Sequence, residues 1–240
     1  MENEYIKTVE TNLGGVLSRI RSASQGRSVE LLLATKTVPA EVINYVSAHF
    51  GASLIGENKV QELLEKYDAL DKDRLKIHFI GHLQTNKVRQ IVDKVEMIHS
   101  LDRCELAKEI SKRSLAIGRK MPVLVEINIA REPEKSGVSP ENAIDFIKEA
   151  ALFEGIQIKG LMTMAPARIS SEEYKAYFRQ TKALFDEIAA LGIEGVQMDV
   201  LSMGMSDSYV EAAECGSNMV RVGSAVFGKR VYPETKPENN

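Results

Sequence analysis

The segment Leu31-Leu32-Leu33-Ala34-Thr35-Lys36-Thr37-Val38-Pro39 is the clearest indication of the fold in this sequence. It opens with a continuous apolar run, which is typical of a strand covered on both faces in a parallel sheet. The run ends at Lys36, and Thr37-Val38-Pro39 marks a break at which a strand gives way to a helix. Parallel α/β folds keep their chemistry at this end of their strands, so Lys36 is expected to face a site.

A lysine in this position has two interpretations. A desolvated amine can form a Schiff base with a carbonyl compound. Alternatively, Lys36 only extends its ammonium group to solvent or pairs with a carboxylate. The segment by itself favours the second interpretation, and the C-terminal third of the chain shifts the balance toward the first.

The rest of the chain repeats the same alternation. From Val29 onward, short β-rich apolar runs alternate with amphipathic segments, which predicts βα units and a parallel sheet. A chain of 240 residues suits one barrel of alternating strands and helices, so we expect an α/β protein with a (β/α)8 TIM-barrel fold. The eight predicted strands lie near Leu31–Thr35, Ser53–Ile55, Ile77–Ile80, Met97–Ile98, Val123–Ile127, Ile156–Met162, Met198–Leu201 and Met219–Val222.

Apolar residues ahead of the first strand recur at helical spacing, which predicts one extra N-terminal helix that packs against or caps the barrel. These residues are Ile6, Val9, Leu13, Leu17 and Ile20. No low-complexity linker divides the chain, so residues 1–232 are predicted to form a single domain, followed by a polar tail at 233–240.

Two later helix starts carry a capping-box pattern, in which a short polar residue is followed three residues later by a glutamate. One pattern is Asp102 with Glu105, and the other is Ser170 with Glu173. Both predict a helix that begins directly after the first residue of the pair.

Composition and charge exclude several classes of protein. The chain is 44% hydrophobic and 27% charged, as in soluble globular proteins, and its formal net charge of −3 gives no reason to expect a nucleic-acid partner. No apolar stretch approaches membrane-spanning length, and Met1-Glu2-Asn3-Glu4 is acidic where a secretory signal is basic. We therefore expect a cytoplasmic protein that binds no membrane.

Metal and disulfide chemistry are not indicated either. The two cysteines, Cys104 and Cys215, have no CxxC spacing, so neither a disulfide framework nor a zinc site is signalled. The four histidines are scattered along the chain, and we expect no metal centre.

The last predicted strand continues into a turn that suits an anion. In Arg221-Val222-Gly223-Ser224, the glycine lets the backbone approach a ligand and the serine begins a short helical piece whose amides favour a phosphate. Ser206, after the preceding strand, can offer its hydroxyl and amide to the same anion. Phosphate sites in eight-stranded barrels often lie after the last two strands. Each motif alone also fits an ordinary capped helix.

Four further side chains are candidate contacts. Arg221 is expected to point into the barrel mouth, where it needs either a structural carboxylate or a ligand heteroatom as partner. Asn58 and His82 follow the second and third strands and suit either ring or substrate contacts or helix caps. Met203 fits core packing better than contact with a flat ring.

Six ordered segments together resemble the pyridoxal phosphate homeostasis proteins, whose barrel is related to the N-terminal domain of alanine racemase. The segments span nearly the whole chain, and their order and spacing carry more weight than any one of them. They are Ala34-Thr35-Lys36-Thr37, Gly56-Glu57-Asn58, His78-Phe79-Ile80-Gly81-His82-Leu83-Gln84, Gly160-Leu161-Met162-Thr163, Ser202-Met203-Gly204-Met205-Ser206 and Arg221-Val222-Gly223-Ser224-Ala225-Val226-Phe227-Gly228.

The resemblance implies a cofactor, pyridoxal 5′-phosphate (PLP), which Lys36 carries as an internal aldimine. It implies that Arg221 faces the pyridine nitrogen and that Asn58 lies beside the ring. The residues expected to hold the phosphate are Ser206, Gly223 and Ser224. His82 and Met203 are additional candidate contacts.

Two positions depart from the family pattern. Ser224 stands where threonine is frequent, and Ser208 stands where a second acidic residue is expected after Asp207. Neither removes an expected cofactor contact, and both concern the details of phosphate binding and the start of the following helix.

The expected arginine has a consequence for function. A guanidinium stays protonated and donates to the pyridine nitrogen, so the ring becomes a weaker electron sink. We therefore expect a PLP carrier in cofactor homeostasis without catalytic turnover, with PLP, amino acids and PLP-dependent apo-enzymes as partners.

In the racemases to which the resemblance points, the second base comes from an additional β-domain of the partner subunit. This chain stops soon after the phosphate segment, so we expect no such domain and a monomer.

Two alternatives stay open. One is a PLP-dependent amino-acid racemase that uses Lys36 as one base and a residue such as His82 as the other. The second is a phosphate-binding barrel that uses Lys36 in an aldolase-like Schiff base without a cofactor.

Overall fold

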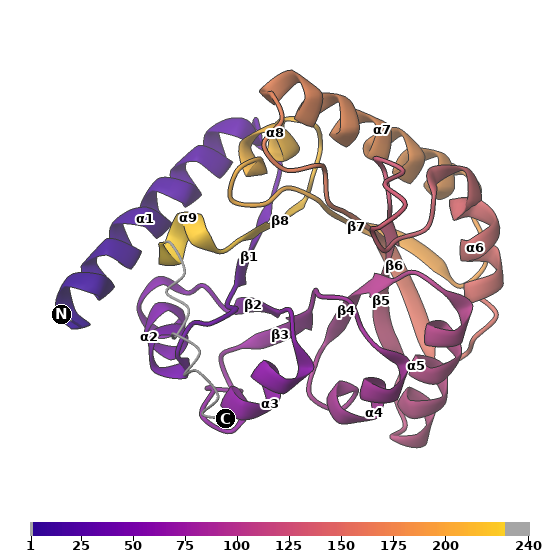
Figure 1. The fold of residues 1–240 in the computed structure, drawn as a ribbon, viewed down its shortest axis with the longest axis horizontal. Coiled ribbons are helices and arrows are strands. Elements are labelled where there is room, and N and C mark those ends of the chain that lie inside the picture. Colours follow the sequence, from indigo (N-terminus) through magenta and orange to yellow (C-terminus); the bar gives the residue numbers. More distant parts are fainter. Residues whose placement is uncertain (1, 229–240) are drawn as a thin grey trace, which may run out of the picture.

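Eight parallel strands close into a barrel in which β8 pairs with β1 (Figure 1). The structure is a computed structural model and describes residues 2–228. The predicted (β/α)8 TIM barrel is confirmed. In chain order the strands are β1 (Glu30–Ala34), β2 (Leu54–Glu57), β3 (Lys76–Phe79), β4 (Met97–Leu101), β5 (Met121–Ile127), β6 (Ile156–Thr163), β7 (Val196–Ser202) and β8 (Met219–Val222).

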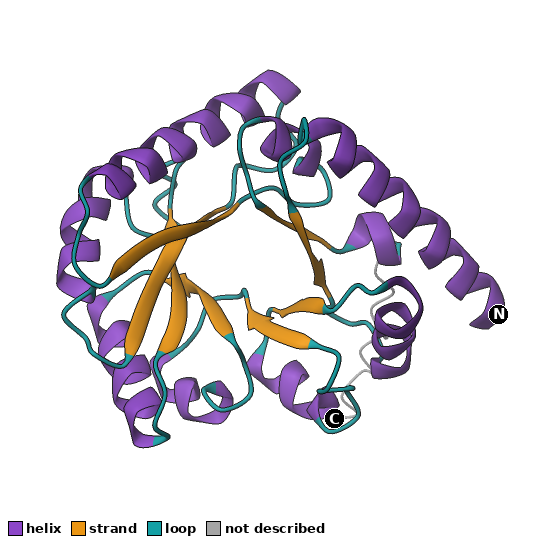
Figure 2. Ribbon diagram, turned by 180° about the vertical axis from the view of Figure 1, so that it is seen from behind, coloured by secondary structure: helices purple, strands orange, loops and turns teal. Residues whose placement is uncertain are grey.

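Helices surround the strands on the outside of the barrel, as Figure 2 shows. The α-helices are α1 (Glu2–Ala23), α2 (Ala40–Phe50), α3 (Val60–Tyr67), α4 (Val88–Ile91), α5 (Cys104–Ala116), α6 (Ala143–Ala150), α7 (Ser171–Ala190), α8 (Tyr209–Glu214) and α9 (Ser224–Phe227). Two short 3₁₀ turns, η1 (Thr85–Lys87) and η2 (Pro140–Asn142), precede α4 and α6.

Side chains alternate between two sides of the barrel wall, because successive residues of a strand point in opposite directions. The larger hydrophobic cluster, which includes Leu33 and Val220, fills the space between the strands and the helices. A smaller cluster lies inside the barrel, where it is separated from the helices by the strands. Its buried members are Leu32, Leu54, Ile80 and Met219.

The predicted N-terminal helix is present as α1, and it packs against α8 and α9 outside the barrel (Figure 1). The Tyr5 hydroxyl donates to the Phe227 carbonyl oxygen at 3.2 Å, and the Asn12 amide donates to the Val226 carbonyl oxygen at 3.1 Å. Val16 belongs to the buried face of α1, whereas Leu17 is 40% exposed. The helix therefore supports the segment that follows β8.

Two local predictions were less accurate. The strand near Met97–Ile98 extends to Leu101, because the polar residues His99 and Ser100 that interrupt the apolar pattern are fully buried. The capping box expected at Asp102 does not form. Helix α5 begins at Cys104 after Arg103, and the Asp102 carboxylate pairs with the Arg103 guanidinium instead.

The second capping box is confirmed. Ser170 is the N-cap of α7, with both reciprocal hydrogen bonds to Glu173. The predicted polar tail at 233–240, and with it the domain boundary at 232, lies outside the described residues.

Within residues 2–228, no helix has the length and apolar character needed to cross a membrane. In the same part of the chain, no cluster of three or more His, Cys, Asp or Glu side chains is arranged to hold a metal ion.

Candidate functional site

Lys36 lies two residues beyond the end of β1, and its position in the alternation matches that of Leu32 and Ala34, whose side chains point inward. Leu32 belongs to the cluster inside the barrel, and Ala34 packs against that cluster. Strand alternation therefore directs the Lys36 side chain to the barrel mouth, while Leu33 and Thr35 face the helices. The ends of β7 and β8 meet at the same mouth, so the chain order places the predicted anion turn beside the lysine.

Two cavities at this end of the barrel share one wall. The first, of about 260 Å³, is lined by Lys36 and by residues of the turn that follows it. The second, of about 200 Å³, is lined by Asn58, Ser206 and Arg221. The shared wall consists of Ala34, Gly223 and Ser224. The lysine and the predicted phosphate and ring contacts thus lie on the two sides of one turn.

The Gly223-Ser224 turn is fixed by the loop after β7. The Ser206 hydroxyl oxygen accepts hydrogen bonds from the backbone N–H groups of Gly223 and Ala225, each at 3.2 Å. A Cβ atom at position 223 would lie 3.0 Å from the Ala34 carbonyl oxygen, closer than nearly all Cβ contacts. Glycine therefore allows the turn to approach the end of β1, the strand that carries Lys36.

Arg221 is buried inside the barrel and is held by the ends of two other strands. One terminal nitrogen, Nη1, donates to the Ser202 carbonyl and hydroxyl oxygens at 2.8 and 2.7 Å, and Nη2 donates to the Thr163 carbonyl oxygen at 2.9 Å. From the sequence, we predict that Arg221 pairs with either a structural carboxylate or a ligand heteroatom. The hydrogen bonds of its guanidinium instead go to carbonyl and hydroxyl oxygens. Burial lowers the pKa of Arg221 to about 10, so the guanidinium stays charged at neutral pH.

Two buried histidines continue the network from Ser202. The Ser202 hydroxyl lies 3.3 Å from His99 Nδ1, and His99 Nε2 lies 2.9 Å from His78 Nδ1. Burial lowers the pKa of His78 to about 4 and that of His99 well below its ordinary value. Both rings are therefore neutral at neutral pH. They extend the hydrogen-bond network from Ser202, which contacts Arg221, without placing a second charge beside the guanidinium.

Glu126, on β5, is a buried carboxyl group that interacts electrostatically with Arg221. Burial is the main reason that its pKa is raised to about 7, and the nearby charge of Asp102 adds to the effect. Arg221 acts in the opposite direction. Inside the barrel, the Arg221 cation therefore interacts with a carboxyl group, Glu126, that titrates near neutrality.

The remaining sequence candidates separate into three environments. Asn58 lines the second cavity. His82 lines neither cavity, and its Nδ1 atom faces the Ser136 hydroxyl at 3.0 Å and an Asp102 carboxylate oxygen at 3.8 Å. Met203 is fully buried in the large hydrophobic core, and Met205 lines the second cavity in its place.

Comparison with known proteins supports the family resemblance that the six sequence segments indicated. The family model described as "Alanine racemase, N-terminal domain" matches residues 16–231. A relative from Aquifex aeolicus, "Pyridoxal phosphate homeostasis protein", is 42% identical over 225 residues, which are 92% of this chain and 97% of the relative. This chain belongs to the pyridoxal phosphate homeostasis protein family.

A solved structure of the same kind is PipY of Synechococcus elongatus, described as having PLP bound. It is 30% identical, with a TM-score of 0.78 over 88% of this chain and 99% of that protein. Alanine racemase from Clostridium difficile has a TM-score of 0.73 at 16% identity, over 97% of this chain and 59% of that protein. The racemase similarity concerns the fold, and it shows that the family barrel matches part of a longer racemase chain.

Several residues that line or support the site of this family member were missed by sequence reasoning. Ile80, Met164 and Asp207 line the second cavity. Met164 and Ile80 lie one residue beyond the ends of β6 and β3, so the strand-end rule applied to Asn58 would also have found them. The His78–His99 contact had no such signal, because it joins residues on neighbouring strands whose register is set only by the closed barrel.

Proposed function

We propose that this chain binds PLP covalently through Lys36 and serves intracellular PLP homeostasis without catalytic turnover. The observation that supports this most directly is the shared wall at Ala34, Gly223 and Ser224. It brings Lys36, which lies two residues beyond β1, next to a cavity lined by a guanidinium, an amide and hydroxyl groups.

The residues around the second cavity fit PLP. The hydroxyl groups of Ser206 and Ser224 and the backbone N–H of Ser224 suit a phosphate, with the Gly223 N–H hydrogen-bonded to the Ser206 oxygen. The apolar side chains of Ile80, Met164 and Met205 suit a flat ring. PLP supplies an aldehyde, whose carbon forms a C=N bond to a lysine amine with release of water. Lys36 provides that amine from across the shared wall, and Asn58 provides a polar contact at the second strand end.

Arg221 supports a carrier over a catalyst. Its guanidinium, fixed by two carbonyl oxygens and one hydroxyl, keeps its protons and donates to a ring nitrogen as a hydrogen-bond donor. Transamination and decarboxylation, which need a strong electron sink, are therefore disfavoured, whereas a racemase can tolerate this arginine but needs bases on both faces of the cofactor. The position of His82 also supports this interpretation, since a racemase needs a second base at the cofactor and His82 lines neither cavity.

The proposal extends to partners. Free amines, including amino acids, compete with Lys36 for the aldehyde, so they release or recruit the cofactor and allow its delivery to PLP-dependent apo-enzymes. We propose that the chain acts in the cytoplasm as a single-domain monomer.

Borohydride reduction of the protein with PLP, followed by peptide mass mapping, tests the covalent step. We expect the pyridoxyl label on Lys36 in the wild type, its loss in Lys36→Ala, and its retention in Lys59→Ala, which removes an exposed lysine next to Asn58. Labels spread over surface lysines would contradict the proposal. A chiral assay with several L-amino acids tests turnover, and racemisation that depends on Lys36 would favour the enzyme instead.

A further inference from the structure

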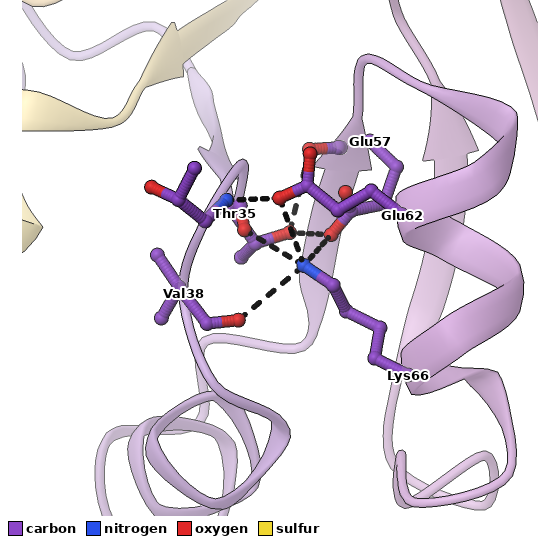
Figure 3. A network of polar contacts seen from close by, with 7 residues as sticks. Thr35, Val38, Glu57, Glu62 and Lys66 are labelled. Carbon is purple, nitrogen blue, oxygen red and sulfur yellow. Dashed lines mark hydrogen bonds and ion pairs between the residues drawn. The ribbon is translucent and has the colours of Figure 1, made fainter. Parts of the chain in front are cut away.

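The backbone on both sides of Lys36 is held from outside the barrel by one lysine of α3. The Lys66 ammonium donates to the Thr35 carbonyl oxygen at 3.0 Å and to the Val38 carbonyl oxygen at 3.3 Å. It also pairs with Glu57 at 2.9 Å and with Glu62 at 3.6 Å. Figure 3 shows Lys66 at the centre of these groups, reaching from α3 toward the end of β1.

The two glutamates hold the same turn through other atoms. The Thr35 hydroxyl donates to Glu57, the last residue of β2, and the Thr37 backbone N–H donates to Glu62 in the first turn of α3. Hydrogen bonds from this cluster therefore reach the residue before Lys36 and both residues after it. We call Glu57, Glu62 and Lys66 the α3 clamp.

The held turn contains a strained residue. Thr37 has a φ of 64°, in the left-handed region that a β-branched residue rarely adopts. Such a conformation persists only where the surroundings impose it, and here the Thr37 N–H and the carbonyl oxygens of Thr35 and Val38 are hydrogen-bonded to side chains of α3. The strain and its restraints lie directly next to Lys36.

The charged groups of the α3 clamp lose hydration on burial, and this desolvation lowers their net contribution to stability. The Glu57 side chain is fully buried and that of Lys66 is 11% exposed. A second Glu57 oxygen, Oε2, is buried without a hydrogen-bond partner among the described residues. Buried ion pairs are often no more stabilising than apolar side chains of similar volume, so a role in geometry accounts better for this one.

We propose that the α3 clamp positions Lys36 for covalent attachment of an aldehyde, by fixing the turn of residues 35–38 so that the lysine side chain leaves β1 toward the shared wall with Gly223 and Ser224. Glu57, Glu62 and Lys66 are positioning residues, because they contact the backbone around Lys36 and line neither cavity. This inference rests on the proposed function. The step that it concerns joins the Lys36 nitrogen to the aldehyde carbon, and the aldehyde oxygen leaves as water.

Lys66→Met tests the clamp, because it keeps the length of the side chain and removes the ammonium group. Lys112→Met, at an exposed lysine of α5, is the matched control. Two quantities are measured on the full chain: the rate at which the Lys36 adduct forms, by timed borohydride quenching and mass mapping, and the affinity for 4′-deoxypyridoxine 5′-phosphate, which lacks the aldehyde.

We expect Lys66→Met to slow adduct formation on the order of tenfold to a hundredfold, because small displacements of a reacting group cost up to about 10²-fold in rate. Affinity for the aldehyde-free analogue should stay within about twofold of the wild type, since the groups that bind phosphate and ring are unchanged. Lys112→Met should behave as the wild type in both measurements.

A second pair keeps the test decisive if Lys66→Met does not fold. Glu62→Ala removes the acceptor of the Thr37 N–H, and Glu65→Ala removes an exposed glutamate of the same helix. We expect slower adduct formation in Glu62→Ala only. Wild-type rates in Lys66→Met and Glu62→Ala, or an equal loss of analogue affinity, would overturn the proposed positioning role. No Lys36 adduct in the wild type would instead refute the proposed function, and the inference with it.

Discussion

The carboxyl group of Glu126 should make the stability of the protein fall as pH rises through neutrality. Glu126 lies inside the barrel, 4% exposed. Burial, with a smaller effect of Asp102, raises its pKa from 4.5 to about 7, against the opposing charge of Arg221. Glu126→Gln keeps the shape of the side chain and removes the ionisation, so it isolates this effect.

The magnitude follows from the difference between the folded and unfolded pKa values. Because the folded pKa is the higher one, the stabilisation from the neutral carboxyl is fully present below pH 4.5 and is lost as pH rises through 7. A pKa raised from 4.5 to about 7 corresponds to about 3 kcal/mol of folding free energy between these limits. Relative to the wild type, Glu126→Gln should therefore gain on the order of 3 kcal/mol of stability on going from acid to pH 8.

Urea denaturation of the PLP-free protein at several pH values between 4 and 8 measures this difference. His78 and His99 also titrate below neutrality, but they are present in both proteins and cancel in the comparison. Glu134→Gln, at an exposed glutamate, should show a stability difference that does not vary with pH. A constant difference between Glu126→Gln and the wild type would refute the reasoning that burial controls this carboxyl group.

Three further predictions, made with four substitutions, test the packing that supports the barrel. Gly223→Ala places a Cβ 3.0 Å from the Ala34 carbonyl oxygen, so we expect a loss of about 1–3 kcal/mol in urea denaturation and weaker PLP binding by spectroscopic titration. Leu13→Ala should destabilise the protein by about 2–5 kcal/mol, whereas Leu17→Ala, at a position that is 40% exposed, should cost less than half as much in the same experiment. Ser170→Ala removes the N-cap of α7 and should cost about 1 kcal/mol, measured as a lower urea midpoint with an unchanged slope.

The barrel could be predicted because its strands are covered on both faces and so appear in the sequence as apolar runs. The prediction of β4 fell short where this signal fails, at His99 and Ser100, which are buried but polar. His99 is buried next to His78 and Ser202, two residues that only the closed barrel brings to it. The polar lining of the interior could not be predicted for the same reason, since it depends on the register between strands.

The α3 clamp illustrates the same limit at the site itself. Lys36 stands out in the sequence because it ends an apolar run, whereas Lys66 lies in an amphipathic helix where a lysine is ordinary. Its contacts to Thr35 and Val38 span 31 and 28 residues, and they exist because α3 packs behind the first two strands. Strand-end rules find residues that face the mouth of a barrel, but they do not find residues that hold those strand ends from outside.

Three of the expected cofactor contacts, Lys36, Ser206 and Arg221, lie on segments that are hydrogen-bonded to groups from a neighbouring strand end or helix. Arg221 of β8 is held by carbonyl oxygens at the ends of β6 and β7, and Ser206 after β7 is bonded to the turn after β8. Lys66 after β2 holds the turn after β1. Groups held by neighbouring strand ends lose little freedom on binding, so binding of phosphate and ring should depend on the supports of Ser206 and Arg221, and covalent attachment at Lys36 on Lys66. A change that loosens the support of Arg221 or Ser206 should therefore weaken binding of the ring or the phosphate, even when neither residue has been altered.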